Sequence, residues 1–290
     1  MTTRDPIPAI VETEATGETA AVFAELRTVL GVPFVNLIWR HLATIPGGLD
    51  WTWSLLRPLY GSAALEEAAQ ALCARINVAC LPLDGFVYDA VGVDTEARRA
   101  IAALIVDYNR ANALNFLALS MACRVLRGEH LVPTTAAPRA ASAVPSPGVV
   151  GVATPPLPTM NALSPALHAL VLDFDSFGRI APSTAVASLY RHLGHWPGFL
   201  ALAHTALAAS HRDGRLRMQQ EMLIERSREI VTLRLEPLLP AVPPLPGAAE
   251  RDRILLALDE FTRLMIGRMV VMGTALLALL PGEAMRPRAR

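Results

Sequence analysis

A short motif occurs twice in this chain, and the repetition constrains the fold more than any other feature of the sequence. Residues 35–47 read VNLIWRHLATIPG, and residues 186–198 read VASLYRHLGHWPG. Arg, His, Leu and the closing Pro-Gly recur in register, from Arg40 to Arg191, at an offset of 191 − 40 = 151 positions. An aromatic residue precedes each Arg. These shared residues and the aromatic match at one offset predict an internal duplication.

The apolar pattern predicts helices in both halves. Apolar residues recur at spacings of three and four, and the alternation typical of strands is nearly absent. We therefore expect an all-α fold, an internally duplicated helical bundle whose halves form a pseudo-dimer packed face to face. The expected helices are 18–30, 34–44, 49–59, 63–78 and 95–126 in the first half, and 165–177, 184–195, 198–209, 216–233 and 248–280 in the second.

A proline-rich stretch separates the two halves. Residues 131–160 hold seven prolines among Ala, Ser, Thr and Gly, with Arg139 as the single charged residue. Proline fixes φ and removes a backbone donor, so this Pro/Ala-rich segment is expected to be an extended linker. The predicted organisation is a first helical repeat at 1–130, the linker at 131–160 and a second helical repeat at 161–290. The three parts are expected to form one integrated unit.

The composition excludes several classes of partner. Hydrophobic residues make up 52% of the 290 positions, and 26 basic residues balance 26 acidic ones. A net charge of zero argues against nucleic acid and against an anionic membrane surface as partners. The apolar run 269–280 is too short for a membrane span of about 20 residues and suits a buried helix. With a polar, acidic N-terminal stretch and three cysteines that lack metal-ligand spacing, the chain is expected to be cytoplasmic.

The duplication gives an internal test of which residues are functional. Residues shared by both halves, such as the Arg-His pairs, are expected to be structural, whereas unshared polar residues are candidates for function. Asn109 and Asn112 are such candidates, because they interrupt an apolar helix and align with Phe261 and Leu264 in the second half. A buried amide needs a partner, which can be backbone, water or ligand. Ser188 is likewise unmatched.

Other chemical motifs are weak. His192 and His195 are spaced as metal ligands could be, but no Cys or carboxylate accompanies them at ligand spacing, and we predict no metal site. Asp173 and Asp175 are two residues apart, so on a helix they face different directions and do not form a pair. The sequence has no glycine-rich phosphate loop, no G-x-S-x-G motif and no lysine nucleophile.

Three segments together resemble the group I 2-haloacid dehalogenases, which act on both D and L substrates. The segments are 32–35 (VPFV) continuing to 40–47 (RHLATIPG), 108–112 (YNRAN), and 187–190 (ASLY) continuing to 196–197 (WP). They occur in the family's order and cover most of the chain, including the linker and the duplication. The motifs are short, so their order and spacing carry the resemblance.

The resemblance implies an all-α fused pseudo-dimer with its active site between the repeats and no cofactor. In the family an Asp general base activates a water that an Asn helps to hold, and the water displaces halide directly from C2. By position, Asn112 matches the water-holding Asn, and Phe34 and Leu37 match aromatic residues of the substrate pocket. Ser188 matches the Ser beside the base. Asn109, which is polar on the same helix, is added as a substrate-binding candidate.

The family's base position is occupied by Leu189. Leucine cannot take a proton, and removing a general base typically lowers the rate by about 10²–10⁴-fold. The favoured hypothesis is a divergent 2-haloacid dehalogenase-like protein that binds a small, mostly apolar molecule with a carboxylate between its repeats. Its hydrolytic activity would be weak, altered or lost, so whether it is an enzyme stays open.

Two alternatives remain. In the first, the chain is an active hydrolase in which another side chain, Asp173, Asp175 or His192, replaces the base. In the second, it is a non-catalytic ligand-binding or helical interaction module. The expected partner is a small-molecule ligand without nucleic acid or membrane, and a homodimer stays open.

Overall fold

The computed structural model describes residues 7–285 of the chain, apart from 79, 130–153, 184 and 240–241. Within these residues the regular elements are helices and none is a strand, so the all-α prediction is confirmed. The first helices along the chain are α1 (Gly17–Leu30), α2 (Leu37–Leu42), α3 (Gly48–Tyr60), α4 (Ala63–Cys73), α5 (Gly85–Ala90) and α6 (Thr95–Arg127). The later ones are α7 (Pro165–Asp175), α8 (Ser188–Leu193), α9 (Pro197–Arg212), α10 (Arg215–Ile230), α11 (Ala248–Glu260) and α12 (Gly267–Leu279).

Short turns of other helical types complete the chain. Two are π-helical, namely η3 (Val231–Leu235) and η5 (Phe261–Ile266). The 3₁₀ turns are η1 (Glu12–Glu14), η2 (Met160–Ala162), η4 (Glu236–Leu238) and η6 (Gly282–Met285). π-Helical turns inside longer helices often occur at functional sites, and η5 joins α11 to α12 beside the cavity described below.

Helix α6 is the centre of the core. The Asp94 side chain accepts a hydrogen bond from the Ala97 amide at 2.8 Å and caps its start, and Gly128 ends it in the left-handed conformation (φ 71°). Its 33 residues span about 50 Å at 1.5 Å per residue. Every residue from 111 to 119 is buried. A helix that is covered on all sides is a core helix, and the other helices pack around it.

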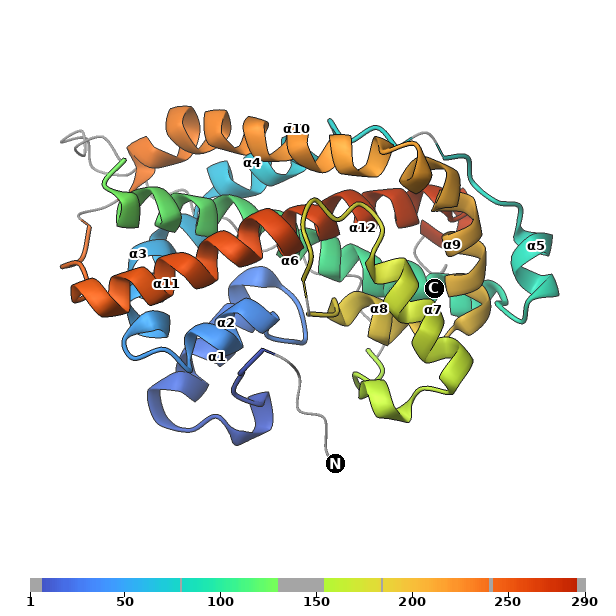
Figure 1. Ribbon diagram of the computed structural model, residues 1–290, viewed down its shortest axis with the longest axis horizontal. Helices are drawn as coiled ribbons and strands as arrows, with labels where there is room; N and C mark the ends of the chain where they lie inside the picture. Colours follow the sequence, from blue (N-terminus) through green and yellow to red (C-terminus); the bar gives the residue numbers. More distant parts are fainter. Residues whose placement is uncertain (1–6, 79, 130–153, 184, 240–241, 286–290) are drawn as a thin grey trace.

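The helices are arranged along this central axis (Figure 1). The stretch α11–η5–α12 runs beside α6, with α4 and α10 along the same side of the pair and α1–α2 and α7–α8 towards its two ends. The helical stretch Ala248–Leu279 has the length and apolarity of a membrane span, but 67% of its most apolar window is buried inside the protein. The predicted run 269–280 therefore lies in a core helix.

Three helix boundaries predicted from the sequence are wrong for the same physical reason. In each case, a side chain distant in the sequence accepts a hydrogen bond from a backbone amide near the helix end. Helix α4 ends at Cys73 rather than 78, and the Asn77 amide then donates to the Gln219 side chain at 3.1 Å. Helix α2 begins at Leu37 rather than 34, because the Val35 amide donates to the Glu12 carboxylate at 2.9 Å.

Helix α8 also begins later than predicted. It starts at Ser188 rather than 184, and the Ala187 amide donates to the Asp175 carboxylate at 3.0 Å. The short helix α5 was not expected at all. For the boundaries of α4, α2 and α8, the side chain that binds the backbone amide is too distant in sequence for local propensity to reveal it.

Most of the predicted linker 131–160 lies outside the described residues. Residues 154–159 have no regular structure, and Thr154, Pro155 and Leu157 line the cavity between the two halves of the chain. The internal duplication, the pseudo-dimer and the boundaries of the predicted parts stay predictions.

Candidate functional site

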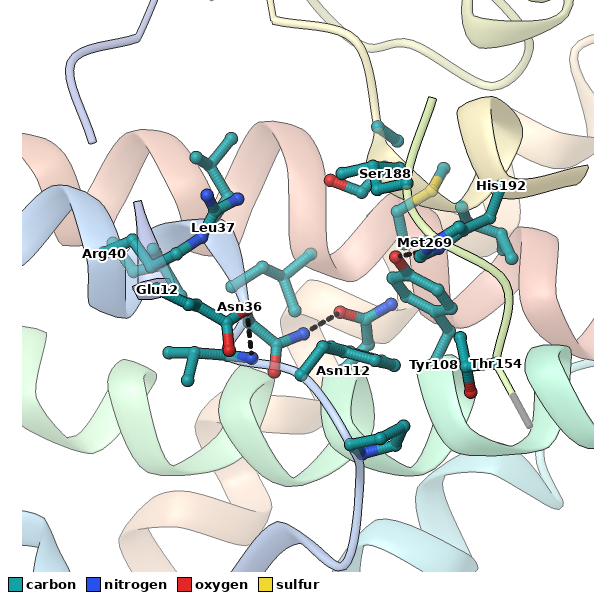
Figure 2. A pocket seen from close by; sticks show the side chains of 18 of the residues that line it. Glu12, Asn36, Leu37, Arg40, Tyr108, Asn112, Thr154, Ser188, His192 and Met269 are labelled. Atoms are coloured by element: carbon teal, nitrogen blue, oxygen red, sulfur yellow. Dashed lines mark hydrogen bonds between the residues drawn. The ribbon is translucent and has the colours of Figure 1, made fainter. Parts of the chain in front are cut away.

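A cavity of about 540 Å³ lies where the two halves of the chain meet. Its wall comes from 11–13, from 33–38 and Arg40 around α2, from α6, from the start of α8 and from η5 and α12. Figure 2 shows the α2 residues on one side of the cavity, with Ser188, His192 and Met269 facing them across Asn112. The lining is mainly apolar with a few polar groups, as is typical of small-molecule sites.

Five of the six residues singled out from the sequence line this cavity. They come from three helices that are far apart in the chain, namely α2 and the loop before it, α6, and α8. The five residues are Phe34, Leu37, Asn112, Ser188 and Leu189. Their placement brings the predicted site together in space, while the role of each one stays a prediction.

Asn109, the sixth candidate, lies outside the cavity. Its Nδ2 donates to the Thr274 hydroxyl at 3.3 Å, and its Oδ1 would be only 2.7 Å from a Cβ added at Gly273. A side chain at Gly273 would therefore push α6 and α12 apart. Asn109 packs between helices, where Thr274 accepts from its Nδ2 while its Oδ1 is buried without a partner among the described residues.

Asn112 is buried in the cavity wall, and a hydrogen bond from Asn36 orients its side-chain amide. Its Oδ1 accepts a long hydrogen bond (3.5 Å) from Nδ2 of Asn36, at the start of α2. The Nδ2 group of Asn112 then points to the side of the cavity where Tyr108 and Met269 lie (Figure 2). Asn36 Oδ1 is buried without a partner among the described residues. The pair can thus offer a donor and an acceptor to a bound water or ligand.

A second group of hydrogen-bonded side chains, Tyr108, Ser188 and His192, joins α6 to α8 along the cavity wall. The Tyr108 ring stacks on Phe34, with 4.4 Å between centroids, and its hydroxyl lies 2.7 Å from Nδ1 of His192. Tyr108 is also hydrogen-bonded to the Ser188 hydroxyl, and His192 to the Pro155 carbonyl. A carbonyl can only accept, so His192 carries its proton on Nε2, and Nδ1 accepts from the Tyr108 hydroxyl.

Burial keeps the Tyr108 phenol and the His192 imidazole neutral. Burial raises the pKa of the Tyr108 phenol well above its ordinary value, although the charges of Arg40 and Arg191 oppose the rise. Burial, with a smaller contribution from the neighbouring His195, lowers the pKa of His192 from 6.5 to about 4. With both nitrogens engaged and a low pKa, His192 orients Tyr108 and is a poor general base at neutral pH.

Leu189 forms the wall beside Ser188 and is 1% exposed. Neither aspartate proposed as its replacement lines the cavity. Asp175 is fully buried and is bound by Arg179, Arg268 and the Ala187 amide, so it holds the segment that leads into α8. Asp173 points outward and pairs with His204 at 2.6 Å.

Glu12 is the one carboxylate among the described lining residues, and its oxygens are engaged. Oε1 accepts from the Val35 amide, and Oε2 accepts from Arg27 at 3.1 Å. It thereby ties the N-terminal segment to the loop before α2. The described residues contain no group of three His, Cys, Asp or Glu side chains suited to a metal ion.

Two charged cavity residues, Glu12 and Arg40, were not candidates from the sequence, and His192 was one only as an alternative base. Arg40 and His192 were assigned to structure because both halves share them. The two histidines of the repeated motif nevertheless lie in different environments. His41 bonds to the Pro8 carbonyl at 2.7 Å, whereas His192 bonds to the Tyr108 hydroxyl. No signal in the sequence marks Glu12, which reaches the cavity only through the path of the N-terminal segment.

Comparisons with known proteins agree with this architecture. No family model matches the chain. A configuration-inverting 2-haloacid dehalogenase of Alcaligenes xylosoxydans xylosoxydans is 24% identical over 238 residues, which is 80% of this chain and 78% of that protein. An (R)-2-haloacid dehalogenase of Pseudomonas putida is 32% identical over 72 residues, or 24% of each chain, so that match is local.

A solved structure has the same fold over nearly the whole chain. The crystal structure of a D-2-haloacid dehalogenase mutant superposes with a TM-score of 0.77 at 16% identity, covering 94% of this chain and 95% of that one. The complex of a D-2-haloacid dehalogenase mutant with D-2-CPA gives a TM-score of 0.76 at 14% identity, covering 95% and 96%. The sequence and structural likenesses point to the same group of proteins.

Proposed function

We propose, from its likeness to the 2-haloacid dehalogenases, that the cavity of this chain binds a small, mostly apolar molecule that carries a carboxylate. In this proposal, hydrolytic removal of halide from C2 by direct water attack is lost or greatly weakened. The activities of these relatives are assigned to this chain only as part of the proposal, since a shared fold does not fix a function.

The observation that carries the proposal is the side chain of Leu189. It lies in the cavity wall beside Ser188, at the position where the resemblance places the base, and it has no group that accepts a proton. Asp173 and Asp175 are engaged elsewhere, His192 is neutral with both nitrogens bonded, and Glu12 is bound by Arg27 and Val35. The cavity keeps Asn112 to hold a water but has no evident group to activate it.

The cavity itself favours ligand binding over a purely structural role. Side chains leave about 540 Å³ between the halves, which is within the size range of small-molecule sites. Asn112 and Ser188 supply polar contacts at its centre, and Phe34, Leu37 and Leu189 supply apolar ones. A helical module that only joined its two halves would be expected to fill this space.

A halide-release assay with both enantiomers of 2-chloropropionate tests the catalytic part. The wild type is expected to release halide at least about 100-fold more slowly than a family member with its base, and Leu189→Asp is expected to raise the rate. Leu189→Asn is the matched control, because it has nearly the same shape as Asp without a basic carboxylate. Rapid turnover by the wild type, unchanged in Leu189→Asn, would show that another group is the base.

The location in the cytoplasm and the oligomeric state are further expectations. The sequence pattern predicts a cytoplasmic protein, and a homodimer stays open. Fractionation of the native cells and light scattering of the purified chain test these two points.

A further inference from the structure

We propose that Arg40 is the group that binds the ligand's carboxylate, so that the cavity is selective for monocarboxylic acids over their neutral analogues. This inference rests on the proposed function, because it assigns one end of the ligand to one side of the same cavity. It also assigns the other end, since the apolar body of the acid would extend from α2 towards α8 and α12.

The Arg40 side chain lines the cavity and has no counter-ion among the described residues. None of the ion pairs between described residues includes it, and its Nε is buried without a hydrogen-bond partner. Figure 2 places the guanidinium beside Leu37, across the cavity from Ser188 and His192. A guanidinium offers five donors in a fixed plane and binds a carboxylate through two parallel hydrogen bonds. An unpaired one in a concave wall is therefore a ready anion site.

The equivalent arginine of the repeated motif shows what a structural role looks like. Arg191 is 7% exposed, and its Nε donates to the Pro158 carbonyl at 3.0 Å. The two arginines occupy the same place in the Arg-His-Leu pattern, but Arg191 binds the protein's own backbone while Arg40 faces the cavity. If both were structural, Arg40 would be expected to have a comparable partner.

The other charges at the cavity leave Arg40 available. Glu12 is the acidic group of the described lining, and its oxygens bind Arg27 and the Val35 amide. The charge of Arg40 also acts inside the cavity, because it opposes the rise in the pKa of the buried Tyr108 phenol. Because Arg27 offsets the charge of Glu12, the charge of Arg40 is left uncompensated among the described lining residues, which favours an anion over a neutral or cationic ligand.

Apolar side chains from α8, η5 and α12 line the cavity beside Ser188 and His192. Leu189, Ile266 and Met269 lie there, and the volume of about 540 Å³ exceeds what a three-carbon acid needs. We therefore infer a ligand with a carboxylate head and a longer hydrocarbon body. Each added methylene that becomes buried is expected to tighten binding by up to about fourfold, from 0.8 kcal/mol per CH₂.

Calorimetric titration with hexanoate and with hexanamide tests the assignment. The two probes share their hydrocarbon body and differ in charge. The wild type is expected to prefer hexanoate, and Arg40→Met to lose about 10- to 100-fold in affinity for hexanoate while its affinity for hexanamide stays the same. Arg40→Lys keeps a cation and should retain part of the preference. Arg217→Met, on the exposed face of α10, is the control and should bind as the wild type does.

Thermal unfolding of the same variants separates binding from structure. Removing an unpaired, half-buried cation should leave the unliganded Tm unchanged or raise it, whereas loss of a structural arginine would lower it. The inference is overturned if Arg40→Met keeps the preference for the acid, or if it loses both probes equally. If the wild type binds neither hexanoate nor the shorter acid propionate, the proposed cavity function itself fails, and the assignment fails with it.

Discussion

The neutral state of His192 predicts a specific dependence of stability on pH. Its folded pKa of about 4 is below the ordinary 6.5, because burial disfavours the imidazolium, and His195 and Arg191 add like charge. Between these two values the unfolded chain therefore binds more protons than the folded one. The resulting stability is fully present above pH 6.5 and is lost as the pH falls towards 4. Proton linkage gives a loss of about 2 kcal/mol between pH 7.5 and pH 5.

Urea unfolding of the wild type and of His192→Asn between pH 5 and pH 7.5 measures this effect. Asparagine can still accept from the Tyr108 hydroxyl but does not titrate, so other titrating groups cancel in the difference between the two proteins. The stability difference should shift by about 2 kcal/mol towards the variant as the pH falls from 7.5 to 5. A difference that stays constant over this range would refute the reasoning, because it would mean that folding does not change the affinity of His192 for protons.

Two further variants test the contacts that position the site. Asp175→Asn should lower the free energy of unfolding by about 3–5 kcal/mol, because it leaves two arginines without their buried counter-charge, whereas Asp173→Asn on the same helix should change it by less than about 1 kcal/mol. Equal effects in urea unfolding would contradict the distinction. Asn115→Ala should lower it by about 2–4 kcal/mol, since its Oδ1 accepts from both Trp39 (3.0 Å) and Tyr60 (2.6 Å). Thermal unfolding within about 0.5 kcal/mol of the wild type would show that water replaces the amide.

Helix positions were largely predictable because local apolar spacing decides them. The range predicted for α6, 95–126, differs from the observed Thr95–Arg127 by one residue, since an Asp cap and a closing glycine are visible in the sequence. The starts of α2 and α8 were not predictable. They depend on Glu12 and Asp175, whose carboxylates bind backbone amides that lie 35 − 12 = 23 and 187 − 175 = 12 residues further along. Propensity rules do not describe such long-range partners.

The sequence predicted which residues form the candidate site only in part, because position along a helix does not by itself fix which way a side chain faces. Asn109 and Asn112 are three residues apart, which places them about 60° apart around α6. That angle is enough to turn Asn112 to the cavity and Asn109 to Gly273. For Arg40 the sequence predicted a structural role rather than a place in the ligand site. Recurrence of the Arg in both copies of the motif predicted one structural role, but Arg191 binds the Pro158 carbonyl while Arg40 faces the cavity.

Leu189 and Arg40 together change what the cavity can do with an acid. A general base at position 189 would place a carboxylate in the same cavity as the ligand's own carboxylate. Two such charges repel each other across a cavity of low dielectric constant, and an enzyme must offset this repulsion to turn over its substrate. Leucine removes both the base and the repulsion, while Arg40 keeps its attraction for the acid. In Leu189→Asp, halide release should therefore rise while the affinity for hexanoate falls, and Leu189→Asn should show neither change. A rise in both quantities would mean that a charge at position 189 does not repel the carboxylate of the ligand.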